Sequence, residues 1–181
     1  MKVGIVVLVV IVALLVSALA IFSFDLVSYT ATGSQTLNPQ GTSIGRALVV
    51  YDPGLSGAAK NDATRIADDL QAKGYTVVLA GVRSEVTSEN SGFNITVAGG
   101  PLYFGKVTSS IDGFLKTLPN NTKIGVFGST GSSTFSQSDF NSTLKQVDSD
   151  VKNQSVTLKM ILDGNETSNC AELVTILTEQ G

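Results

Sequence analysis

A turn that could bind an anion lies in the stretch YDPGLSGAAKNDATRIADDL, which begins at Tyr51. An apolar run, a glycine-containing turn and an amphipathic helix follow one another there, an order that commonly cradles a phosphate on the helix N-terminus. The turn has a single hydroxyl, and Asp52 would repel a phosphate placed near it. Two interpretations stay open: an anion site made of backbone N–H groups and one hydroxyl, or a tight turn without a ligand. The candidate anion-binding residues are Ser56, Gly57, Ala58 and Ala59.

Two further glycine-rich loops, 99–106 and 128–137, also follow apolar runs. Ligands of parallel sheets sit beyond the carboxyl ends of the strands, and the loop 52–58 and these two all leave such ends. We therefore expect the three loops to converge on one site.

The elements that must position these loops alternate between strand and helix. Such alternation predicts right-handed βαβ units and a parallel sheet covered on both faces. In the helix after the first loop, Asp62 is among the charged residues expected mostly on the wet side. The expected strands are 46–51, 75–82, 93–101, 123–129 and 156–162, and apolar spacing predicts helices within 59–70, 107–118, 140–151 and 170–177.

The N-terminal run VGIVVLVVIVALLVSALAIFSF, from Val3 to Phe24, contains no charged residue. Its length predicts a transmembrane helix or signal anchor over residues 1–24, with cleavage after the SALA sequence as the alternative. The polar segment 25–45 is expected to be a flexible linker rich in Ser, Thr and Gly, and residues 46–181 to be one globular domain. Because Lys2 precedes the run, the positive-inside rule predicts a cytoplasmic N-terminus and an extracytoplasmic domain.

Composition excludes several classes of site. The chain has no His, which excludes His–Cys zinc sites and Ser-His-Asp triads. Its net charge of −3 argues against a nucleic-acid partner, and no metal site is expected. The one cysteine, Cys170, lies on an apolar helical stripe and is expected to be a core residue.

Three stretches resemble the flavodoxin family: VAGGPLYFGKVTSSIDGFLKTL at 97–118, ATRIADDLQAKGYTV at 63–77 and IGVFGSTGS at 124–132. The resemblance covers residues 46–181. It implies an α/β flavodoxin-like three-layer sandwich with a five-stranded parallel sheet of order 2-1-3-4-5, preceded here by one transmembrane helix. It also implies FMN as cofactor, bound where the strand order reverses.

The resemblance assigns roles to the loops. The family's phosphate loop carries three hydroxyls, and alignment leaves one of them, Ser56, with Ala59 in place of another. An aromatic of the second loop would stack on the flavin ring, with Phe104 in the core and Tyr103 capping the turn as the alternative. The third loop would offer backbone donors to the flavin's pyrimidine edge, with a solvated loop as the alternative. The implied cofactor-binding residues beyond the first turn are Pro101, Tyr103, Phe104, Gly105, Gly128, Ser129, Thr130 and Gly131.

Two functions of different classes follow from these expectations. The first is a membrane-anchored flavodoxin-like protein that carries out FMN-linked electron transfer with a membrane-bound redox protein as partner. The second is a flavin-free binding or structural domain of the same fold, displayed on the membrane surface.

Overall fold

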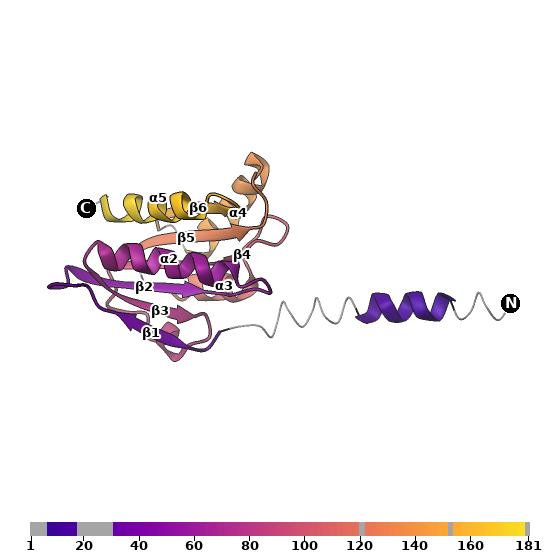
Figure 1. Ribbon diagram of the computed structural model, residues 1–181, viewed down its shortest axis with the longest axis horizontal. Helices are drawn as coiled ribbons and strands as arrows, with labels where there is room; N and C mark the ends of the chain where they lie inside the picture. Colours follow the sequence, from indigo (N-terminus) through magenta and orange to yellow (C-terminus); the bar gives the residue numbers. More distant parts are fainter. Residues whose placement is uncertain (1–6, 18–30, 120–121, 152–153, 180–181) are drawn as a thin grey trace.

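A six-stranded sheet forms the middle layer of the domain, and helices cover both of its faces (Figure 1). The computed structural model describes residues 7–17, 31–119, 122–151 and 154–179. The strands are β1 (Ser34–Leu37), β2 (Gly45–Tyr51), β3 (Tyr75–Gly81), β4 (Ile95–Pro101), β5 (Lys123–Thr130) and β6 (Val156–Leu162). The helices are α2 (Ala58–Ala72), α3 (Ser109–Leu115), α4 (Gln137–Asp150) and α5 (Glu166–Glu179), with a short 3₁₀ helix, η1 (Glu85–Ser88).

The sheet has the order β1-β3-β2-β4-β5-β6. Strands β2 to β6 are parallel, and their relative order is the one implied by the family resemblance. The predicted count of five strands was wrong, because β1 adds a sixth, antiparallel to β3.

Strand β1 arises within the segment predicted to be a flexible linker. It pairs with β3 from Ser34 opposite Ala80 to Leu37 opposite Val77. The pairing continues outward, where the N–H of Gly81 donates to the carbonyl of Gly33 at 2.9 Å. A Cβ at position 81 would lie 2.2 Å from the carbonyl oxygen of Ala31, so this close approach requires glycine. The expected order 2-1-3-4-5 places the second strand, 75–82, at an edge of the sheet, and the pairing with β1 shows that this position was wrong.

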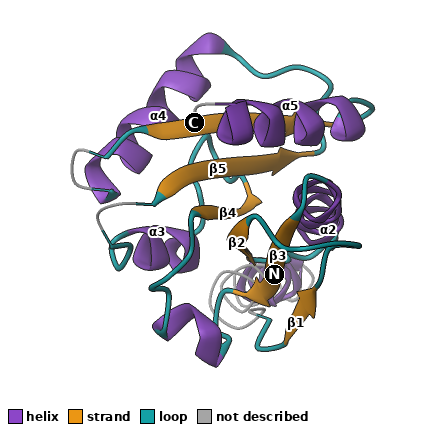
Figure 2. Ribbon diagram, turned by 90° about the vertical axis from the view of Figure 1, so that its left-hand side faces the viewer, coloured by secondary structure: helices purple, strands orange, loops and turns teal. Residues whose placement is uncertain are grey.

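The two faces of the sheet bury separate apolar layers. Figure 2 shows the helices on both sides of the sheet. Helices α2 and α5 pack on one face, where Ile66, Leu70 and Leu173 are fully buried. Helix α3 packs on the opposite face and buries Phe114 and Leu115, as its apolar spacing predicts. Because both faces are covered, the ligand-accessible part of the sheet is its carboxyl edge.

The helix near the N-terminus covers residues 7–17 of the part that the structure describes. No helix among the described residues is long and apolar enough to span a bilayer. This finding contradicts the predicted single-pass membrane location, and with it the predicted extracytoplasmic side. The rest of the predicted span, residues 1–6 and 18–24, lies outside the described residues.

Candidate functional site

A cavity of about 570 Å³ lies at the carboxyl edge of the sheet. It is bounded by the loop before α2, the ends of β4 and β5, and the start of α5. This volume falls within the range of small-molecule sites. The lining residues are Leu55, Ser56, Ala58, Ala59, Asn61, Asp62, Arg65, Pro101, Leu102, Tyr103, Ser129, Thr130, Gly131, Ile161, Asp163 and Glu166.

The structure brings together residues from all three glycine-rich loops. Eight of the twelve sequence-predicted site residues line the cavity, namely Ser56, Ala58, Ala59, Pro101, Tyr103, Ser129, Thr130 and Gly131. The remaining four, Gly57, Phe104, Gly105 and Gly128, do not. Gly128 instead packs under Leu102, whose side chain lies 2.6 Å from where a Cβ at position 128 would stand.

The first turn ends at Gly57, which precedes α2 with φ of 73°. This left-handed conformation suits glycine and turns the chain into the helix. The hydroxyl of Ser56 accepts a hydrogen bond from the N–H of Ala58 at 3.3 Å. The bond uses the N–H of Ala58 within the loop, while Ser56 retains its own O–H as a donor.

Asp52 is buried, and its carboxylate bonds both to the start of α3 and to the backbone of this turn. Its carboxylate accepts hydrogen bonds from Thr108 Oγ1, at 2.9 Å, and from Ser110 Oγ, both at the start of α3. It also accepts a hydrogen bond from the N–H of Gly54 at 3.3 Å. Asp52 does not line the cavity, so its role is to join the end of β2 to α3.

The second loop is a tight hairpin. The backbones of Tyr103 and Lys106 exchange hydrogen bonds of 3.0 and 3.1 Å, and the two residues between them both have positive φ, 52° at Phe104 and 70° at Gly105. The carbonyl of Gly105 accepts a hydrogen bond from Thr143 Oγ1 at 2.6 Å, which fixes the hairpin to α4. Phe104 is 92% exposed, so the alternative that placed it in the core is wrong.

Asp62 forms part of the cavity wall, although it was expected among the residues on the wet side. Its side chain is only 3% exposed, and Ser129 Oγ donates to its Oδ2 at 2.5 Å. Burial raises the pKa of the Asp62 carboxyl above its ordinary value, while the hydrogen bond from Ser129 acts in the opposite direction. Asp62 follows Ala59 by three residues and precedes Ile66 by four, so helical spacing does place it on the inner face.

Three other charged residues that the sequence had not marked also line the cavity, namely Arg65, Asp163 and Glu166. Arg65 Nη1 donates to Thr167 Oγ1 at 2.9 Å, which ties α2 to α5. Glu166, at the start of α5, has its pKa lowered by backbone hydrogen bonds from its own residue and from Gly164. A helix N-terminus stabilises a carboxylate in this way, so Glu166 presents a negative charge at the cavity.

The cavity suits one part of a flavin better than another. Leu102, Tyr103 and Ile161 offer apolar surface to a flat ring, and Ser129 and Thr130 lie at the end of β5 as polar neighbours. The phosphate of FMN, in contrast, would meet a turn in which the N–H of Ala58 already bonds to Ser56, and a wall that carries carboxylates. The residues present therefore fit an isoalloxazine ring and do not fit a phosphate.

Comparison with protein-family models and with curated proteins found no match. Solved structures do resemble the chain. An archaeal flavodoxin shares 19% identity, covering 75% of this chain and 97% of its own, with a TM-score of 0.56. A flavodoxin of Streptococcus pneumoniae TIGR4 shares 17%, covering 75% and 99%, with a TM-score of 0.55. An NADH:FMN oxidoreductase in its apo form shares 11%, covering 75% and 89%, with a TM-score of 0.58. At these identities the likeness concerns the architecture alone, and the chain has a flavodoxin-like fold.

Proposed function

We propose that this domain binds a flavin in the cavity at the carboxyl edge of its sheet and serves in electron transfer. The observation that carries the proposal is the position of the cavity. The order of the parallel strands reverses between β2 and β4, and open α/β sheets bind ligands at such a reversal. The apolar surface of the cavity and its polar neighbours at the end of β5 have the chemistry that an isoalloxazine ring requires.

The structural neighbours support the same proposal. Two of them are flavodoxins and a third is an NADH:FMN oxidoreductase, so proteins of this architecture include flavin carriers. A bound flavin supplies one- or two-electron transfer, while the protein supplies binding, orientation and electrostatics. In this chain the ring would pack against Leu102 and Tyr103.

The partner of such a carrier would be a second redox protein. FMN is the flavin that the family resemblance implies. Its phosphate fits the cavity poorly, so whether a flavin ring binds and which flavin binds are two separate questions. The first experiment therefore tests the ring.

The test is a titration of flavin by the purified chain, followed by quenching of flavin fluorescence and by the visible spectrum. Binding of FMN, riboflavin or lumiflavin, with quenching that saturates, is the expected result. Replacing Tyr103 with Ala should weaken the binding, because a wall of the cavity is removed. If no flavin is quenched at any accessible concentration, the proposal fails and a flavin-free binding or structural domain becomes the better account.

A further inference from the structure

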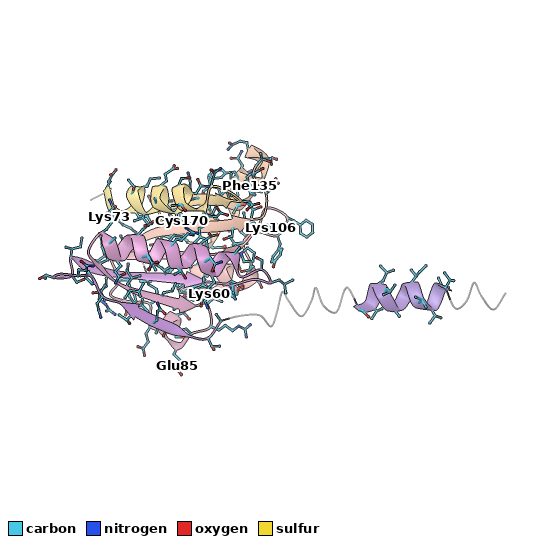
Figure 3. The ribbon with its side chains drawn as sticks, viewed as in Figure 1. Lys60, Lys73, Glu85, Lys106, Phe135 and Cys170 are labelled. Atoms are coloured by element: carbon cyan, nitrogen blue, oxygen red, sulfur yellow. The ribbon has the colours of Figure 1, made fainter. Side chains whose placement is uncertain are left out.

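The charge of the cavity wall is unusual for a site that would receive a phosphate. Three carboxylates line it, from Asp62, Asp163 and Glu166, and Arg65 is the one basic side chain among its lining residues in the described part of the chain. Lys60 and Lys106 lie on the bounding elements without lining the cavity. Figure 3 shows Lys106 near the carboxyl edge and Lys73 at the far end of the domain.

Asp62 provides a second and independent observation. One oxygen of its carboxylate, Oδ2, accepts the hydrogen bond from Ser129, while Oδ1 has no hydrogen-bond partner among the described residues. The side chain is almost wholly buried and lines the cavity. Among the described residues, the one buried side-chain oxygen without a partner is Asp150 Oδ2, so Oδ1 of Asp62 has accessible surface and can accept a hydrogen bond from a ligand in the cavity.

A hydroxyl group is such a donor, and a phosphate dianion is not. The ribityl chain of a flavin carries several hydroxyls, and the flavin without phosphate ends in one more. The phosphate of FMN replaces that terminal hydroxyl by a group of charge about −1.5 to −2 at neutral pH. Next to Glu166 and Asp163 this charge is repelled, and Arg65, the one basic side chain that lines the cavity among the described residues, is bonded to Thr167.

We propose that the cavity selects a flavin with an unphosphorylated ribityl chain, in the manner of riboflavin, over FMN. The carboxylates of Asp62 and Glu166 accept hydrogen bonds from the ribityl hydroxyls and repel the phosphate. This inference rests on the proposed function, since it requires the flavin ring to bind in the same cavity.

The experiment measures the dissociation constants of riboflavin, FMN and lumiflavin for the full chain at pH 7.5, by quenching of flavin fluorescence. We expect riboflavin to bind more tightly than FMN by a factor of about ten or more at low ionic strength. Added salt should reduce this difference in affinity, because it screens the repulsion. We also expect riboflavin to bind more tightly than lumiflavin, which has the ring without the ribityl hydroxyls.

Two variants test whether the carboxylates cause the preference for riboflavin over FMN. Asp62→Asn and Glu166→Gln each remove one negative charge with little change of shape. Each should therefore lower the ratio of the FMN dissociation constant to the riboflavin dissociation constant several-fold. Asp148→Asn, an exposed position on α4 outside the cavity, should leave this ratio unchanged. Circular dichroism of each variant confirms that it is folded. Because the two cavity substitutions are at different positions, one of them still tests the inference if the other variant does not fold.

The outcomes separate this inference from the proposed function. Binding of none of the three flavins overturns both. FMN binding as tightly as riboflavin, or more tightly, overturns the selectivity while flavin binding stands. If the difference in affinity between riboflavin and FMN is unchanged in both cavity variants, the carboxylates do not cause it. If riboflavin binds no more tightly than lumiflavin, the ribityl hydroxyls make no contact. Either result overturns the inference.

Discussion

The carboxylate of Asp52, at the end of β2, accepts a hydrogen bond of 2.9 Å from the hydroxyl of Thr108, which precedes α3. Both side chains are buried, and Ser110 donates to the same carboxylate. Residues more than fifty positions apart in the sequence are thereby joined beneath the loops that bound the cavity. This link holds the first βα turn against the helix on the other side of β4.

Replacing Asp52 with Ala should lower the free energy of unfolding by about 1–3 kcal/mol, because it leaves two hydroxyls without their acceptor. Urea unfolding measures the loss, and Asp148→Ala on the exposed face of α4 serves as the matched control, with an expected change near zero. Since Asp52 does not line the cavity, flavin affinity of the folded variant should be unchanged. A stable Asp52→Ala variant would show that the link contributes nothing.

Replacing Leu115 with Ala should cost about 2–5 kcal/mol, because the side chain is fully buried between α3 and the sheet and its loss leaves a cavity. The same change at Leu55, which is 64% exposed, should cost little. Both values come from urea unfolding followed by circular dichroism. A loss below about 0.5 kcal/mol at position 115 would contradict the packing of α3 described above.

Replacing Asp62 with Asn should change how stability depends on pH. Burial raises the pKa of Asp62 in the folded state above its ordinary value of 3.8, so the folded state holds the proton more tightly than the unfolded state does. The wild type therefore loses stability as the pH rises through the folded-state pKa, whereas the variant has no proton to lose at this position.

The measurement is the urea midpoint of wild type and Asp62→Asn from pH 3.5 to pH 8. We expect the difference in stability to move in favour of the variant as the pH rises, with the acid end as the internal reference because the carboxyl of Asp62 is mostly protonated in the folded wild type there. A difference that is the same at all pH values would mean that the pKa of Asp62 is not raised by folding.

The thiol of Cys170 should be unreactive in the folded protein. It is 0% exposed, and burial, reinforced by the charges of Asp62 and Asp69, raises its pKa to about 12. Because the thiolate is the reactive form, a disulfide reagent at pH 8 should label it only after denaturation. A variant with Cys170→Ala and Ser142→Cys, which places the one thiol on the exposed face of α4, should react at once. Fast labelling of the native wild type would show that α5 opens readily.

The parallel part of the sheet could be predicted from the sequence because its signals are local. Apolar runs such as 123–129 and helical spacing such as that of Ile66 and Leu70 report burial directly. Cys170 was likewise expected in the core, and the structure confirms it. Strand β1 gave no such signal, because an edge strand needs backbone pairing with β3 and its polar side chains carry no pattern.

The cavity was predictable in position and less so in composition. The rule that ligands bind beyond the carboxyl ends of parallel strands brought the three glycine-rich loops together. Arg65 and Glu166 come from helices, and their approach depends on how α2 packs against α5, which neither segment reveals alone. Asp62 was missed because a charged residue at an inner helical position is normally assigned to solvent, and the hydroxyl that satisfies it comes from Ser129, 67 residues away.

Strand β1 also bears on aggregation. The sequence of β3, YTVVLAG, is uncharged and rich in β-branched residues, which is the composition of segments that assemble into cross-β fibrils. With β1 paired to it, β3 is no longer an edge, and the two edges of the described sheet are β1 and β6. Strand β1 is short, and β6 carries Lys159, which pairs with Glu172; short edge strands and charged side chains both discourage edge-to-edge pairing. A chain shortened to begin at residue 45 would keep all five parallel strands and lose this cover. The three polar residues of β1, Ser34, Gln35 and Thr36, thus cover the edge of β3 and disfavour its pairing with a second copy of the domain.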